Sequence, residues 1–112
     1  MSLVWIYVPP GTEYKREQEL DPNQVLMIIN NGCESIKSLL DYIVNNVLHQ
    51  TRYVRASARA YKGGDDALVH FVINVDGGNR EIMVIVSRNP ADTLFNYYTS
   101  SSTENIIECD FG

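Results

Sequence analysis

The sequence predicts one α+β domain over residues 1–112, with one long helix packed on a four- to five-stranded antiparallel meander sheet. Two observations predict this class. Apolar residues recur at helical spacing from Val25 to Leu48, and after Gln50 the apolar period falls to two in successive short runs. A length of 112 residues suits a single domain with one core, and short connections make consecutive strands antiparallel neighbours.

The first element is a strand over Ser2 to Val8, a run of branched and aromatic residues that Pro9-Pro10-Gly11 ends abruptly. The segment from Thr12 to Leu20 is polar and charged. We expect it to form a loop or an arm.

The second element is the long helix. Asp21 is a good N-cap, and Pro22 is suited to the first helical position. Gly32 interrupts the pattern and permits three outcomes: a kink, a break into two helices, or a close approach of the helix to the sheet.

The remaining elements are predicted strands separated by turns. The turn Asp76-Gly77-Gly78-Asn79 is the strongest hairpin signal in the chain. A polar loop, Ser100-Ser101-Ser102-Thr103, and a short terminal strand at Ile106-Ile107 complete the order. The predicted strands cover Arg52–Tyr61, Ala67–Val75, Arg80–Arg88 and Thr93–Thr99.

The two middle strands are apolar on both faces, whereas a meander with one solvated face alternates more cleanly. Something must therefore cover the second face of the sheet. A homodimer partner and the N-terminal arm are the two covers that the sequence offers. The apolar positions are Leu68, Val69, Phe71, Val72, Ile73, Ile82, Met83, Val84, Ile85 and Val86.

The net charge of −5 argues against general binding to nucleic acid or to anionic membranes, and it favours a partner with a basic patch. Cys33 and Cys109 are expected to be two reduced structural thiols, and a bridge between them would need Cα atoms within about 7 Å. No targeting segment is visible, and no apolar run reaches the roughly 20 residues that span a bilayer. A cytoplasmic location is therefore expected.

Few residues suit catalysis. His49 lies at the expected helix end and His70 in a strand, and neither has a nucleophile or carboxylate at a recognisable spacing. We interpret His70 as a hydrogen-bonded sheet residue. No histidines or cysteines have metal-ligand spacing, so the sequence predicts no enzyme, no metal and no cofactor.

Basic and aromatic residues alternate along the strand after the helix. Tyr53, Arg55, Arg59 and Tyr61 share one predicted face. Sheets that bind single-stranded nucleic acid use rings to stack bases and arginines to contact phosphates. The same pattern is typical of a solvated strand face, and also of a protein-binding stripe, since Tyr and Arg are enriched in hot spots.

The order of one strand, one helix and four strands (β-α-β-β-β-β) resembles the cystatin fold, and several features resemble its stefin branch. Pro10-Gly11 matches the trunk before the helix, Lys62-Gly63-Gly64 the first hairpin with its final motif glycine, and Asn89-Pro90 the second hairpin. In that family the three segments form one wedge that plugs the cleft of a papain-like protease. The resemblance therefore implies a partner-binding wedge made of Val8, Pro9, Pro10, Gly11, Tyr61, Lys62, Gly63 and Pro90.

The leading prediction is a non-enzymatic protein-binding module, with cystatin-like inhibition of a protein partner as its specific form. One alternative is a nucleic-acid-contacting domain that uses Tyr53, Arg55, Arg59 and Tyr61. The other is a structural homo-oligomeric accessory protein of viral, phage or defence-related origin, built on the strands that are apolar on both faces.

Overall fold

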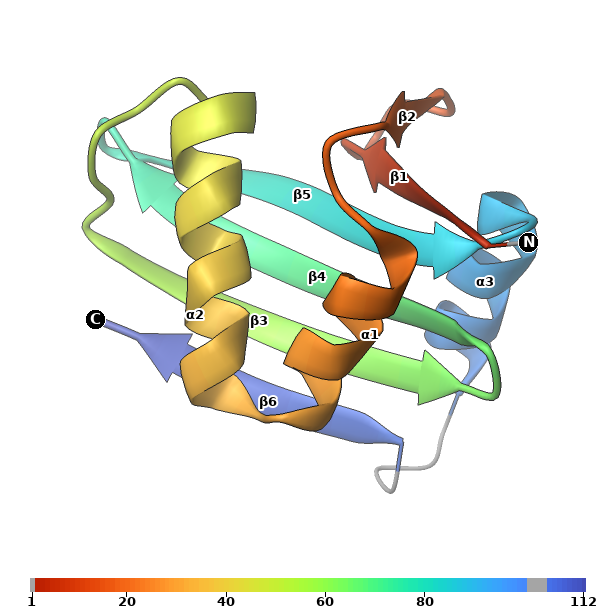
Figure 1. The fold of residues 1–112 in the computed structure, drawn as a ribbon. Coiled ribbons are helices and arrows are strands. Elements are labelled where there is room, and N and C mark those ends of the chain that lie inside the picture. The colour runs from red at the N-terminus through yellow and green to blue at the C-terminus, as the bar shows by residue number, and fades with distance from the viewer. Residues whose placement is uncertain (1, 101–104) are drawn as a thin grey trace.

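Six antiparallel strands form one sheet with helices on both faces (Figure 1). The computed structural model describes residues 2–100 and 105–112. The predicted α+β class with an antiparallel sheet is confirmed. The strands are β1 (Leu3–Tyr7), β2 (Tyr14–Glu17), β3 (Arg55–Gly63), β4 (Asp66–Val75), β5 (Gly78–Ser87) and β6 (Ile106–Phe111). The helices are α1 (Pro22–Asn30), α2 (Cys33–Tyr42), the π-helical η1 (Ile43–Val47) and α3 (Pro90–Thr99).

The predicted single long helix is two helices. Asp21 caps α1 as expected, because its side chain accepts a hydrogen bond from the backbone N–H of Asn23. The helix then breaks at Gly32, whose φ of 90° and ψ of −166° lie in a region that only glycine adopts readily. Of the three outcomes that the sequence left open, the break is the one observed.

A π-helical segment extends α2. The backbone N–H of Leu48 bonds to the carbonyl oxygen of Ile43 at 3.0 Å, five residues earlier. The wider turn keeps Ile43 and Val44 buried against the sheet. His49 follows with φ of 56°, and this left-handed residue ends the helical path.

The three central strands form a meander of β3, β4 and β5, with β3 starting at Arg55 and not at Arg52. The predicted hairpin between β4 and β5 is confirmed. Its two turn residues, Asp76 and Gly77, have positive φ angles of 50° and 79°. Two left-handed residues give the turn twist that a two-residue hairpin favours.

The predicted last strand, Thr93–Thr99, is wrong, because this segment belongs to helix α3. Asn89 caps the helix by accepting a hydrogen bond from the backbone N–H of Asp92, and Pro90 opens it. Thr93 and Tyr97, four residues apart, are the buried positions. The expected four-strand meander is therefore a three-strand meander followed by a helix.

One edge of the sheet differs from expectation, because the predicted arm contains strand β2, which pairs with β1. At the other edge, the short terminal strand predicted at Ile106-Ile107 is present as β6, which is six residues long and pairs with β3. Within residues 2–100 and 105–112 the sheet thus has six strands and not four or five. Most of the predicted polar loop at 100–103 lies outside the described residues.

The sheet's two faces carry separate apolar clusters. Helices α1, α2 and η1 cover the face that includes Phe71, while α3 covers part of the other face (Figure 1). On that second face Leu68, Met83 and Ile85 are fully buried. The chain therefore supplies this cover itself, because Leu94 and Tyr97 of α3 and Tyr14 of the predicted arm pack in the same cluster. A second copy of the chain is not needed to bury these three residues.

Cys33 and Cys109 form a disulfide, with their Cα atoms 5.6 Å apart, so the prediction of two reduced thiols is wrong. The bridge joins the first residue of α2 to strand β6 across 76 residues of chain. Folding brings the pair together because α2 crosses the sheet next to its β6 edge (Figure 1). Within residues 2–100 and 105–112, no helix has the length and apolar character to cross a lipid bilayer.

Candidate functional site

The trunk and the first hairpin of the predicted wedge lie apart, at different positions along the strands and on strands that are not neighbours. In the strand register Tyr7 pairs with Met83, and the turn from Val8 to Gly11 continues beyond that pair toward the start of β5. Gly63 pairs with Asp66, whose neighbour Ala67 pairs with Val86 near the end of β5. The trunk and the first hairpin are therefore not brought together.

The other predicted wedge residues have contacts within the fold. Pro90 opens α3 just after β5, at the same end of the sheet as the β3–β4 hairpin. Tyr61 is buried against Tyr97, with its ring in an edge-on contact at 6.0 Å. The amino group of Lys62 donates to the side-chain oxygen of Asn30 at 2.6 Å, which ties the hairpin to α1.

Three residues of the predicted nucleic-acid face, Arg55, Arg59 and Tyr61, lie on one face of β3, whereas Tyr53 lies apart from them. Tyr53 precedes β3 and packs against the cluster on the α1–α2 side, whereas Tyr61 is buried beneath α3. Arg55 is exposed, and Arg59 forms an ion pair with Glu108 at 3.2 Å. Neither tyrosine presents a free ring beside an arginine, which is what base stacking needs.

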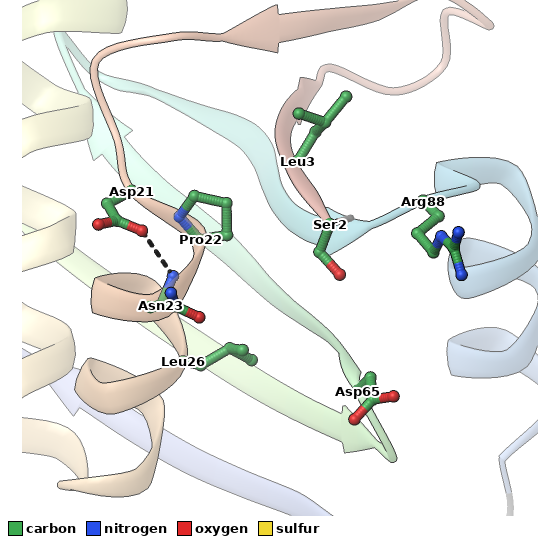
Figure 2. A pocket seen from close by; sticks show the side chains of 8 residues that line it. All are labelled: Ser2, Leu3, Asp21, Pro22, Asn23, Leu26, Asp65 and Arg88. Atoms are coloured by element: carbon green, nitrogen blue, oxygen red, sulfur yellow. Dashed lines mark hydrogen bonds between the residues drawn. The ribbon is translucent and has the colours of Figure 1, made fainter.

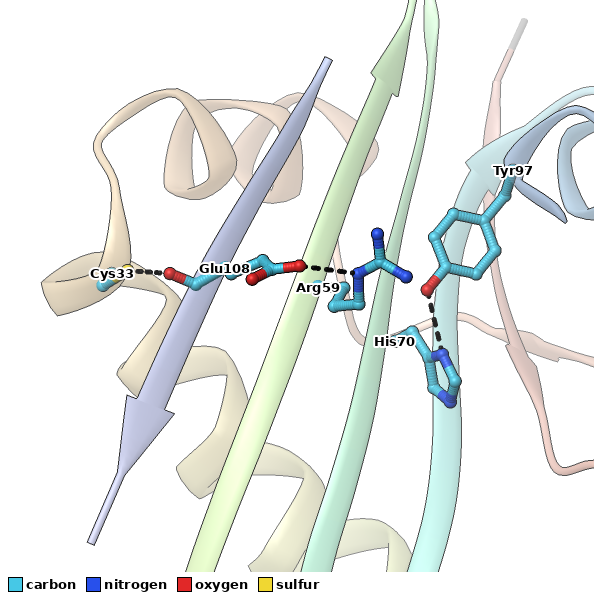
Figure 3. Close-up of polar contacts among 5 residues, drawn as sticks. All are labelled: Cys33, Arg59, His70, Tyr97 and Glu108. Carbon is cyan, nitrogen blue, oxygen red and sulfur yellow. Dashed lines mark hydrogen bonds and ion pairs between the residues drawn. The ribbon is translucent and has the colours of Figure 1, made fainter. Parts of the chain in front are cut away.

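A polar network crosses the sheet at the margin of α3 (Figure 3). His70 Nδ1 lies 3.0 Å from the Tyr97 hydroxyl, and His70 Nε2 lies 3.0 Å from the Glu81 carboxylate. In the neutral histidine, Nε2–H donates to Glu81 and the Tyr97 hydroxyl donates to Nδ1. Both ring nitrogens are thus paired, as the sequence interpretation of His70 expected.

Arg59 extends this network to the edge of the sheet. Its guanidinium lies 5.9 Å from the centre of the Tyr97 ring and bonds to Glu108 on β6. Burial raises the pKa of Tyr97, and the nearby Arg59 cation opposes that rise. Because Tyr97 is only 5% exposed, its hydroxyl fastens α3 to the sheet and is closed to a substrate.

The Cys33 sulfur lies 3.6 Å from the carbonyl oxygen of Glu108, and a dashed line in Figure 3 marks this approach. A disulfide-bonded sulfur carries no proton, so this approach is a packing contact and not a hydrogen bond.

Residues that pair from strand to strand form a row across the sheet, and one such row marks where the cover of α3 ends. This row runs through strands β1 to β6 on one face, because paired residues of antiparallel strands share a face. Its members are Tyr14, Tyr7, Met83, His70, Arg59 and Glu108. Toward the α3 side the next row is largely apolar and includes Ile85, Leu68 and Tyr61. On the far side lie Glu81, Val72 and Ser57, which α3 leaves partly or fully exposed.

Exposed aromatic side chains gather on and beside α3. Phe95 is 67% exposed and Tyr98 is 61% exposed, and their spacing of three positions puts them on one side of the helix. Tyr14 stacks on Tyr7 with ring centres 4.7 Å apart, and Trp5 is half-buried with its indole N–H bonded to the carbonyl oxygen of Ser87. We call Trp5, Tyr14, Phe95 and Tyr98 the α3 aromatic surface.

Two tyrosines of this surface have raised pKa values. Burial raises the pKa of Tyr98, and the acidic groups of Glu81 and Tyr7 raise it further. Burial also raises the pKa of Tyr14, with added contributions from Tyr7 and Tyr98.

Sequence reasoning missed Phe95 and Tyr98 because their segment was assigned to a strand. Two signals could have identified the helix. Asn89-Pro90 is an N-cap followed by proline, and Thr93, Leu94, Tyr97 and Tyr98 recur at helical spacing.

The hollow in Figure 2 lies beside the start of α1 and has a volume of about 510 Å³. Asp21, Asp65 and Arg88 line it, and all three side chains are exposed. The Asp21 carboxylate is already used as the cap of α1 through its bond to the Asn23 backbone N–H. Among residues 2–100 and 105–112, no three His, Cys, Asp or Glu side chains group closely enough to hold a metal ion.

Comparison with protein families, with curated proteins and with solved structures gave no match for this chain.

Proposed function

We propose that this protein is a non-enzymatic protein-binding module that contacts its partner through the α3 aromatic surface. The observation that carries the proposal is the exposure of Phe95 and Tyr98 on a helix that the sheet holds in place. Aromatic side chains of this kind supply much of the binding energy in protein interfaces.

The rigidity of α3 supports this function. Tyr97 bonds to His70, and the Thr93 hydroxyl lies 2.7 Å from the Ser87 hydroxyl and 3.1 Å from the Asp66 carboxylate. These contacts fix the helix before any partner arrives. A preorganised surface loses less conformational entropy on binding than a mobile one.

The cystatin-like inhibitory mode stays a separate prediction that rests on the resemblance. It requires the trunk at Val8–Gly11 and the hairpin at Lys62–Gly63 to act together, whereas the strand register separates them. Trp5 and Tyr14 lie on the paired strands β1 and β2, and Phe95 and Tyr98 lie together on α3, so we favour the α3 aromatic surface as the contact surface.

Location and oligomeric state are part of the proposal. The predicted cytoplasmic location has to accommodate a Cys33–Cys109 disulfide, a bond that persists mainly in oxidising compartments. We therefore favour an oxidising compartment. A homodimer stays a prediction, and its original reason is weaker because Leu68, Met83 and Ile85 are already buried within one chain.

Photo-crosslinking in the native host cells tests the proposed surface. A photoreactive amino acid replaces Phe95 in one variant and Met27 in the other, because Met27 is equally exposed, at 60%, on α1 across the sheet. We expect a discrete crosslinked protein at position 95 and none at position 27. The same products at both positions, or none at position 95, would contradict the proposal.

A further inference from the structure

The hydrogen bonds Glu81–His70 and His70–Tyr97 connect Glu81 on β5 to the residue before Tyr98 on α3. Tyr14 and Tyr7 are paired across β2 and β1 and stack at 4.7 Å. Tyr98 extends from α3, its ring 5.1 Å from that of Tyr97. Glu81 lies on β5 two residues before Met83, which pairs with Tyr7 in the register row. We call Tyr7, Tyr14, Tyr98 and Glu81 the tyrosine–glutamate corner.

The chemistry of this corner suits a cation. Tyrosine rings attract cations to their electron-rich faces, and a carboxylate adds a charged acceptor. One Glu81 oxygen bonds to His70, and the carboxylate has a second oxygen to offer. The Glu81 side chain is 48% exposed and Tyr98 is 61% exposed, so a side chain from outside can reach both.

The protein already uses this combination once within its own fold. The Arg59 guanidinium lies 5.9 Å from the centre of the Tyr97 ring while it bonds to the Glu108 carboxylate at 3.2 Å. Arg59 thus contacts a tyrosine of α3 and an acid of the sheet at the same time. Tyr98 and Glu81 provide the same two kinds of partner, a tyrosine of α3 and an acid of the sheet. Among the described residues, the Glu81 carboxylate bonds to His70 and to no arginine or lysine.

We propose that the tyrosine–glutamate corner receives an arginine or lysine side chain from a basic patch of the partner protein. This inference rests on the proposed protein-binding function and names the chemistry of the partner. The net charge of −5 supports it, because an acidic protein attracts a basic surface over a longer range than the contact itself.

A peptide titration tests the cation directly. A short arginine-containing peptide is added to isotopically labelled protein, and the ring resonances of Tyr14 and Tyr98 are followed by NMR. The matched probe is the same peptide with citrulline, which keeps the shape of arginine and removes its charge. We expect the arginine peptide to shift both rings and the citrulline peptide to leave them unchanged. Equal shifts with both peptides, or no shift with either, would overturn the proposal.

Matched variants separate the ring from the carboxylate. Tyr98→Leu and Glu81→Gln are each expected to weaken arginine-peptide binding about tenfold, the scale of one partly desolvated cation–π or charge contact. Tyr98→Phe keeps the ring and should bind as the natural protein does. Asp110→Asn is the control, since Asp110 is an exposed acid on the same sheet face at the β6 edge. An equal loss in Asp110→Asn would mean that net charge alone attracts the peptide, which overturns the corner as the site.

The two proposals fail in different ways. A protein crosslinked at position 95 whose affinity is unchanged by Glu81→Gln and Tyr98→Leu would retain the protein-binding function and reject the cation site. Arginine-peptide binding at the corner without any crosslinked protein would reject the protein-binding function and the protein partner with it.

Discussion

Tyr42 lies at the end of α2 and reaches the loop after β2, where its hydroxyl donates to the Glu19 carboxylate at 3.2 Å. Burial, then the neighbouring Glu17 and Glu19, raise its pKa from the ordinary 10.0 to about 12. Between pH 10 and pH 12 the Tyr42 hydroxyl keeps its proton in the folded state and loses it in the unfolded state. Stability is therefore retained below pH 10 and falls as the pH rises toward 12.

Titration of tyrosinate absorbance checks this expectation against Tyr42→Phe. The difference between the two curves should show one tyrosine that ionises near pH 12, and the alkaline loss of stability should be smaller in the variant. A difference curve centred near pH 10 would show that the Tyr42 hydroxyl is not held by the two glutamates.

At the residue scale, the sequence predicted the role of a side chain well where that role depends on residues nearby in the sequence. It predicted poorly the roles that depend on contacts with residues far away in the sequence. The cap at Asp21 and the paired state of His70 follow from local patterns. The burial of Tyr61 depends on Tyr97, which is 36 positions away in the sequence and lies on a helix that the sequence pattern assigned to a strand. No reading of the β3 segment alone could reveal that contact.

Gly32 sets the break between α1 and α2. A Cβ at this position would have no heavy atom within 4 Å, so the cost of Gly32→Ala is purely one of backbone conformation. With φ of 90° and ψ of −166°, we expect a loss of about 1–3 kcal/mol in the free energy of unfolding. Denaturant-induced unfolding measures it.

Gly78→Ala is the matched control. Its added Cβ also meets nothing within 4 Å, and Gly78 has no positive φ. We expect its stability to change by less than about 1 kcal/mol. Equal losses in the two variants would show that the break does not depend on the special backbone of Gly32.

At the element scale, amino-acid composition gave the wrong secondary structure for a segment that is too short to show a clear apolar period. The segment Thr93–Thr99 is rich in threonine and aromatic residues, which favour strands, yet two buried positions four residues apart seat it as a helix on the sheet. The β4–β5 hairpin was predictable because Asp76-Gly77 fixes the turn locally. Strand β2 escaped prediction because a four-residue polar edge strand has almost no apolar pattern.

The Cys33–Cys109 disulfide closes the largest loop in the molecule's covalent structure. A separation of 76 residues corresponds to about 4.5 kcal/mol in the chain-entropy description, and measured bridges typically give about 2–4 kcal/mol. We expect the double variant Cys33→Ser/Cys109→Ser to lose about 2–4 kcal/mol in the free energy of unfolding. Unfolding in denaturant, compared with the oxidised protein, measures the loss.

A thiol-reactive reagent provides the control for that experiment. The oxidised protein, unfolded without a reductant, should show no reactive cysteine, whereas the reduced protein should show two. Two reactive thiols before reduction would contradict the bridge.

At the scale of the whole molecule, the sequence predicted the class of the fold but not the strand order. Short connections correctly placed β3, β4 and β5 side by side. The edges needed long-range information, because β1 pairs with β5 about 80 residues later and β6 pairs back with β3. The candidate surface depends on the same long-range order, since it joins β1, β2 and α3.

Burial on both faces of β4 and β5 has an evolutionary consequence. In most antiparallel sheets every second position of a strand faces water and is free to vary, whereas here Leu68, Val69, Met83 and Val84 are all fully buried. A substitution on either face must satisfy a close-packed neighbour. Adaptation to new partners is therefore expected outside the buried parts of β4 and β5, at exposed positions such as Phe95 and Tyr98 of α3, where side chains change without disturbing the core.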